Sequence, residues 1–153
     1  MQRQTCFGPP LSVRRFDRAA IGDAIFTCTR LEAKKNARDS VVLCRLGGRY
    51  RAGRVTCFLS HAPPGKLVDP DEEASLALVR WFGVASTAVE QQVMRSLGCP
   101  VVRASFVDNP AGNLVPLERL APCKLAAVPH GSMPDHLVIL SRFAPFLQKV
   151  PAE

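Results

Sequence analysis

The stretch that decides the fold is SVVLCRLGGRYRAGRVTCFLSH, residues 40–61. Two runs rich in β-branched and other apolar residues, 40–46 and 49–61, predict two strands. Gly47-Gly48 between the runs favours a tight hairpin turn, because the central residues of such a turn need positive φ. Gly53 interrupts the second run, which predicts a bulge or a barrel bend at that position.

Further strands are predicted on both sides of this hairpin, where short apolar runs are bounded by glycine, proline or polar residues. They cover residues 24–31, 76–84, 100–106, 124–128 and 136–140, with a short strand or turn over 114–120.

One helix is predicted over residues 86–97. Ser86 or Thr87 can cap its beginning, and Gly98 follows at the position of a C-cap glycine. Apolar residues recur every fourth position on one of its faces, at Val89, Val93 and Leu97.

The number of short strands decides the expected architecture. Thirteen prolines and ten glycines would destabilise a helical bundle, whereas they suit the turns of a β protein. We therefore expect a mainly β fold, a small curved β-barrel with one or two short helices over residues 21–150. A basic N-terminal arm, residues 1–20, is expected to precede it, because Pro9-Pro10 favours extended backbone.

Length and composition exclude several classes of protein. The 153 residues suit one domain, and 47% hydrophobic with 22% charged residues is typical of a folded chain. The longest apolar runs are about six residues, far short of the roughly 20 that a membrane-spanning helix needs. The N-terminus has no apolar segment of the secretory type. We expect an intracellular protein without a membrane partner.

The positive charge is concentrated in the first third of the chain. The net charge is +7, and residues 1–54 carry 12 Lys and Arg against 4 Asp and Glu. This asymmetry favours an anionic partner such as nucleic acid, an acidic peptide or an anionic surface. The alternative is a solvated basic face that only keeps the domain soluble.

A candidate anion-binding stripe lies within this basic third. Arg49 and Arg51 differ by two positions and so share one face of a strand, and Arg45 lies across the Gly-Gly turn. The preceding loop adds further cations, so that the predicted stripe consists of Lys34, Lys35, Arg38, Arg45, Arg49 and Arg51. Contacts of this kind bind phosphates with an affinity that depends on salt and not on base sequence.

The six cysteines and three histidines give little support to an enzyme or a metal site. No two cysteines stand as C-x-x-C, the spacing that zinc sites use, and the cysteines in apolar runs suit small buried side chains. A small metal-binding or enzymatic domain built on Cys99, Cys123, His130 and His136 remains an alternative. We predict no catalytic residue, no metal ligand and no cofactor.

Several motifs, in order along residues 21–128, resemble the bromo-adjacent homology domain. Gly22-Asp23 followed by apolar residues resembles its first strand, and Tyr50 to Leu59 is similar to its Y-x-G-R-I strand. Val79-Arg80-Trp81-Phe82 resembles its V-x-W-F/Y motif. Later segments resemble its D-x-V-P and K-C-x-V stretch: Phe106 with Asp108, Leu114 to Leu117, and Cys123 to Leu125. The Arg-, Ala- and Pro-rich composition is also similar to that of barrel modules in algal proteins, some of them linked to transposons.

The resemblance implies a non-enzymatic interaction module in the nucleus, associated with chromatin or nucleic acid. A histone tail or another peptide would then be a partner, and aromatic rings would surround a methylated lysine by cation–π attraction. Tyr50, Trp81 and Phe82 are the candidates for such an aromatic pocket. Trp81 and Phe82 are adjacent on a strand, so only one of them should line a pocket while the other enters the core. The alternative is a domain of a mobile-element protein that contacts only the phosphates of nucleic acid.

Overall fold

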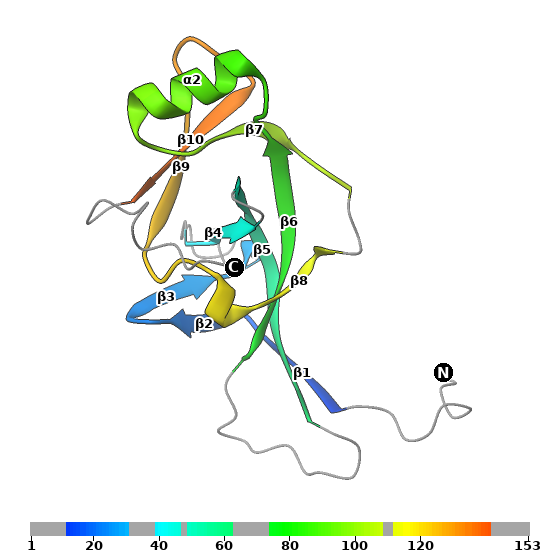
Figure 1. Ribbon diagram of the computed structural model, residues 1–153. Helices are drawn as coiled ribbons and strands as arrows, with labels where there is room; N and C mark the ends of the chain where they lie inside the picture. Colours follow the sequence, from blue (N-terminus) through cyan, green and yellow to red (C-terminus); the bar gives the residue numbers. More distant parts are fainter. Residues whose placement is uncertain (1–11, 31–38, 47–48, 63–73, 109–111, 142–153) are drawn as a thin grey trace.

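The computed structural model describes residues 12–30, 39–46, 49–62, 74–108 and 112–141. The described part is mainly β, as the sequence predicts (Figure 1). The strands are β1 (Ser12–Phe16), β2 (Arg18–Ile21), β3 (Ala24–Thr27), β4 (Val41–Leu46), β5 (Arg49–Ala62), β6 (Leu76–Val84), β7 (Val101–Phe106), β8 (Leu114–Pro116), β9 (Leu125–Pro129) and β10 (His136–Ser141). The helix α2 (Ala88–Leu97) joins β6 to β7, and a 3-10 turn, η3 (Leu117–Arg119), follows β8.

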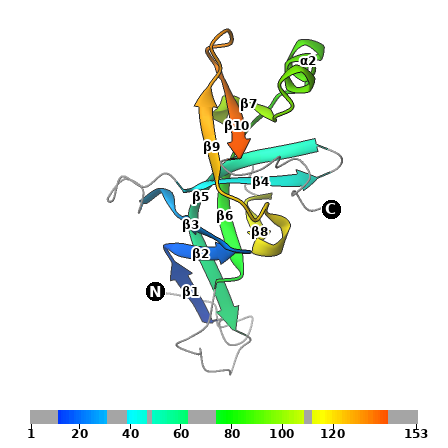
Figure 2. The same ribbon diagram turned by 90° about the vertical axis from the view of Figure 1, so that its left-hand side faces the viewer.

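The long strand β5 organises the sheet. One edge of β5 pairs with β4 along residues 49–54 and with β1 along residues 58–62, and its other edge pairs with β6. The sheet continues through β7 and β10 to β9, while β8 pairs with β6. The β2–β3 hairpin forms a separate small sheet. Figures 1 and 2 show α2, β9 and β10 at one end of the molecule and β1 at the other.

The described strands do not close into a barrel, so this part of the predicted architecture is wrong. In the described residues the sheet runs from β1 to β9 as an open path, and these two outer strands do not pair. The physical reason is that the apolar residues form two cores and not one interior. Val42 and Cys44 of β4 pack in a first core with Phe26 and Trp81.

The second core lies on the opposite face of β4. Val41 and Leu43 pack there with Phe82 and Ile139. The continuous apolar run of β4 is therefore buried on both faces, which explains why it does not alternate with polar residues.

Residues 12–20 are part of the fold, although the sequence predicts an N-terminal arm over residues 1–20. Ser12 to Phe16 pair with β5, and in β2 the buried Ala19 and Ile21 alternate with exposed residues. Because alternate residues of a strand share a face, Ala19 and Ile21 lie on the face of the β2–β3 hairpin that covers the first core. The rest of the predicted arm lies outside the described residues.

Gly53 marks a close approach between strands, and the bulge that the sequence predicts there occurs instead between Val55 and Cys57. A Cβ atom on residue 53 would lie 2.3 Å from the carbonyl oxygen of Arg80 and 2.7 Å from Cγ1 of Val79. Only a glycine lets β6 pass at this distance.

We therefore expect Gly53→Ala to lower the free energy of unfolding by about 1–3 kcal/mol, the usual cost of overpacking a core. Urea denaturation measures this difference. Gly131→Ala is the matched control, because a Cβ atom at residue 131 would meet no heavy atom within 4 Å. Equal stability of the two variants would contradict the close approach.

In the part of the chain that the structure describes, no helix has the length and apolar character needed to span a membrane.

Candidate anion-binding pocket

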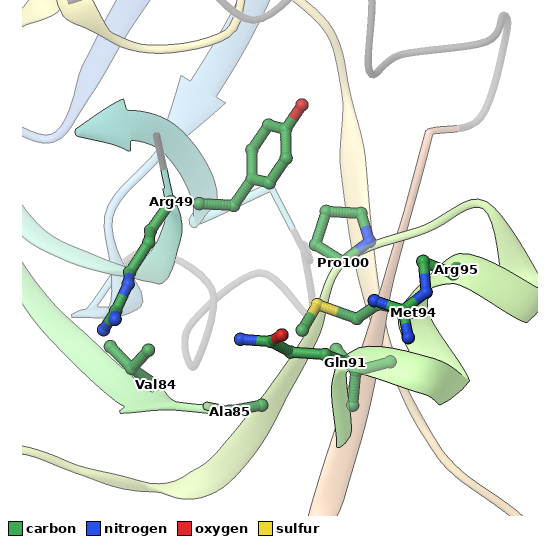
Figure 3. A pocket seen from close by; sticks show the side chains of 9 residues that line it. Arg49, Val84, Ala85, Gln91, Met94, Arg95 and Pro100 are labelled. Atoms are coloured by element: carbon green, nitrogen blue, oxygen red, sulfur yellow. The ribbon is translucent and has the colours of Figure 1, made fainter. Parts of the chain in front are cut away.

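A pocket of about 310 Å³ opens between the beginning of β5 and the helix α2. Figure 3 shows Arg49 on one side and Gln91, Met94 and Arg95 of α2 on the other. The end of β6 and the beginning of β7 complete the walls, so that the lining residues are Arg49, Tyr50, Val84, Ala85, Gln91, Met94, Arg95, Pro100 and Val101. The side chains of Arg49 and Arg95 thus flank a cavity whose walls are as polar as they are apolar.

The helix presents its pocket residues because of its length and its caps. Gln91, Met94 and Arg95 are three and four positions apart and therefore share one helix face. Thr87 begins the helix by accepting a hydrogen bond from the backbone N–H of Glu90 at 3.2 Å. Gly98 ends it in the left-handed conformation, with φ of 69°. Thr87 is thus the N-cap, one of the two candidates in the sequence.

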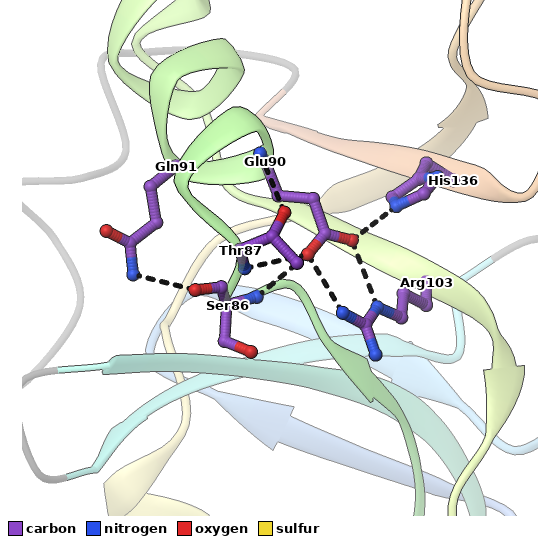
Figure 4. A network of polar contacts seen from close by, with 6 residues as sticks. All are labelled: Ser86, Thr87, Glu90, Gln91, Arg103 and His136. Atoms are coloured by element: carbon purple, nitrogen blue, oxygen red, sulfur yellow. Dashed lines mark hydrogen bonds and ion pairs between the residues drawn. The ribbon is translucent and has the colours of Figure 1, made fainter.

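A buried carboxylate fixes α2 to the sheet (Figure 4). Glu90 accepts two hydrogen bonds from Arg103 of β7, from Nε at 3.0 Å and from Nη2 at 2.9 Å. Nε2 of His136 in β10 lies 2.5 Å from the same carboxylate. The backbone N–H groups of Ser86 and Thr87 also donate to it, each at 3.0 Å. Glu90 is 5% exposed, so this cluster positions the pocket wall from inside.

The cluster perturbs the acidity of Glu90. The hydrogen bonds from Arg103 hold the pKa of this carboxyl well below its usual range, although burial alone would raise it. The N–H of Thr87 and the side chain of His136 act in the same direction as Arg103. In return, Glu90 raises the pKa of Arg103.

The free energy of unfolding of the domain should therefore depend on pH in the acidic range. Because folding lowers the pKa of Glu90, its contribution is present above its unfolded pKa of about 4.3 and is lost as the pH falls through the folded value. We expect the difference in unfolding free energy between the wild type and Glu90→Gln to stay constant above about pH 5 and to shrink as the pH falls from there toward the lowered pKa of Glu90. The pKa of Asp17 is also lowered, mainly by its hydrogen bond from Arg30. Asp17 is present in both proteins, so its effect on the pH dependence of stability cancels in the difference. A difference that does not change with pH would contradict this assignment.

The structure separates the predicted stripe into exposed and packed cations. Arg45 and Arg49 are exposed, and Arg45 lies opposite Tyr50 with its guanidinium carbon 5.9 Å from the ring centroid. Arg51 instead places its guanidinium 4.7 Å from the ring of buried Trp81, and its Nε is buried without a hydrogen-bond partner. Lys34, Lys35 and Arg38 lie outside the described residues.

Among the described residues, no carboxylate forms an ion pair with Arg45, Arg49 or Arg95. We call these three arginines the arginine surface. Arg45 and Arg49 lie at the β4–β5 end, on opposite faces of the hairpin by its register, and Arg95 lies on the side of α2 that lines the pocket. Arg95 was not anticipated from the sequence, because nothing local places the helix opposite β5.

The three aromatic residues do not form a common surface pocket. Trp81 is fully buried and donates its Nε1–H to the carbonyl of Gly112 at 2.9 Å. Phe82 is also buried and stacks on Phe106 with ring centroids 4.9 Å apart. The expectation that one of the two adjacent rings would face a pocket is corrected, since β6 lies between the two cores and both of its faces are covered. Tyr50 is half-buried and lines the pocket at α2.

The residues considered for a metal or enzymatic site have other roles. His136 contacts Glu90, and Nδ1 of His130 accepts hydrogen bonds from the backbone N–H groups of Ser132 and Met133. No group of three potential metal ligands occurs in the described segments. The cysteines that the structure describes form no disulfide, and Cys6 lies outside them.

Comparison of the chain with protein-family models, with curated proteins and with solved structures finds no match. The resemblance to the bromo-adjacent homology domain therefore stays a prediction.

Proposed function

We propose that this chain is a non-enzymatic module that binds nucleic acid through its phosphates. The observation that carries the proposal is the arginine surface, in which Arg45, Arg49 and Arg95 have no ion-pair partner among the described residues. Guanidinium groups match phosphate oxygens in charge and in geometry. The net charge of +7 adds a field that draws a polyanion to the protein.

Charge favours nucleic acid over a histone tail as the partner. Histone tails are rich in lysine and arginine, so an arginine surface would repel them. A reader of methylated lysine also needs exposed aromatic rings, whereas Trp81 and Phe82 are buried. The proposal thus keeps the chromatin setting that the resemblance suggests, in the nucleus, but assigns the contact to nucleic acid.

Salt dependence tests the proposed function. We expect the affinity for duplex DNA to fall steeply with salt, because each phosphate contact releases a counterion. Arg45→Ala combined with Arg49→Ala should reduce the slope of log affinity against log salt by up to about 1.8, at about 0.9 for each lost contact. Fluorescence anisotropy at several salt concentrations measures the slope.

The matched control for this experiment is Arg18→Ala combined with Arg119→Ala. Both residues are exposed arginines on elements that do not line the pocket, β2 and η3. This variant loses the same charge, so it should change the slope less. Equal slopes for the two double variants would mean that the arginine surface has no special role, and a wild type that does not bind at low salt would refute the proposed function.

A further inference from the structure

We infer that the pocket between β5 and α2 holds one unpaired nucleotide of a single-stranded nucleic acid. This inference rests on the proposed function and names the ligand of the same surface. It adds an element that the sequence does not indicate, namely a cavity beside the phosphate-binding arginines that can receive a base.

The size of the pocket fits this ligand. Its volume of about 310 Å³ lies at the lower end of the range of small-molecule sites. A site of that size can receive one nucleotide, whereas a base that is paired and stacked in a duplex is not available to enter it.

The chemistry of the walls follows the two parts of a nucleotide. Arg49 and Arg95 stand at the flanks with charge for a phosphate, and neither has an ion-pair partner in the described part of the chain. The half-buried Tyr50 and Met94, which also line the pocket, offer an aromatic ring and apolar surface on which the face of a base can pack. A phosphorylated side chain would use the two arginines and leave most of this apolar wall uncovered.

Gln91 supplies the polar group that a base edge requires. Its side-chain amide has both donors and an acceptor, so it can pair with any of the bases. Its Nε2 donates a long hydrogen bond, at 3.5 Å, to the carbonyl of Ser86. We therefore expect weak selectivity among bases, because stacking and one adaptable amide do not read a sequence.

The methionines allow a direct test. The chain has three, of which Met94 lines the pocket and Met133 does not. With the methionine methyl groups labelled with carbon-13, adenosine or uridine 5′-monophosphate should shift the Met94 resonance through the ring current of the base and leave Met133 unchanged. Inorganic phosphate should shift Met94 much less, and Met94→Leu assigns the signal. No shift of Met94 with either nucleotide would overturn the inference, as would a shift with a phosphoserine peptide alone.

Affinities for a single strand and for a blunt duplex complete the test. Tyr50→Ala should weaken the binding of an unstructured oligonucleotide about tenfold and change the binding of the duplex little. Tyr50→Phe keeps the ring and should therefore bind the oligonucleotide as the wild type does. Gln91→Ala should weaken single-strand binding more than Gln92→Ala, because Gln92 is the exposed neighbour outside the pocket.

Equal losses of affinity for single strand and duplex would overturn the inference and leave the proposed function intact. Mononucleotide binding without oligonucleotide binding would also overturn it, by pointing to a free nucleotide. Absence of binding to either nucleic acid would refute both.

Discussion

Trp81→Ala is expected to lower the free energy of unfolding by about 3–5 kcal/mol, the usual cost of truncating a buried aromatic side chain. The indole is fully buried in the first core, and its N–H is bonded to the carbonyl of Gly112. The variant would also remove the ring beneath the guanidinium of Arg51, whose Nε is already buried without a partner. Since domains are stable by only about 5–15 kcal/mol, this loss removes a large part of the free energy of unfolding.

Circular dichroism and urea denaturation measure the effect of Trp81→Ala. Val89→Ala is the control, because Val89 is 68% exposed on α2 and should change the stability by less than about 0.5 kcal/mol. The outcome that contradicts the core role is a Trp81→Ala protein that is as stable as the wild type and has lost only binding to a peptide. Such a result would restore the aromatic pocket that the resemblance implies.

Glu90→Ala is expected to lower the free energy of unfolding by about 2–4 kcal/mol, from the lost capping box and the broken buried ion pair. The cost stays below that of a fully buried pair because the side chain of Arg103 is 43% exposed and can be solvated. His136, which is 17% exposed, would lose its contact with the carboxylate. Because the cluster fixes α2, the variant should also weaken binding in the pocket.

Glu118→Ala is the matched control for Glu90→Ala. Glu118 is exposed on η3 and is not part of the cluster, so its removal should change the stability by less than about 0.5 kcal/mol. Similar stabilities of the Glu90 and Glu118 variants in urea would show that the cluster does not hold the helix.

Most of the elements could be predicted because their signals are local. The hairpin of residues 40–61, the strand 76–84 and the helix caps at Thr87 and Gly98 all follow from apolar runs and turn residues. The barrel could not be excluded from the sequence, because the division of the apolar residues between two cores depends on which strands pair. The face of α2 that packs could not be predicted either. Its apolar residues Val89 and Leu97 are 68% and 47% exposed, whereas Glu90 is buried.

The candidate site was predictable only in part. Arg45, Arg49 and Tyr50 lie on the hairpin that the sequence identifies, so the charge and the aromatic ring could be anticipated there. The opposite wall of the pocket could not be predicted, because no local sequence signal shows that Gln91 and Arg95 of α2 lie opposite β5 in the folded chain. The pattern Thr87-x-x-Glu90 is a local signal for a capping box. Its partners Arg103 and His136 lie 13 and 46 residues further along the chain, with nothing in the sequence to connect them.

The central claim is that an anionic nucleic acid is the partner of the arginine surface. The most direct measurement titrates the wild-type protein against a labelled single-stranded oligonucleotide at about 50 mM salt, where electrostatic binding is strong. A histone-tail peptide, with and without lysine methylation, is titrated in parallel. The account predicts that the oligonucleotide binds and that the affinity falls with added salt, while neither peptide binds. Binding of the methylated peptide with no binding of the oligonucleotide would contradict it.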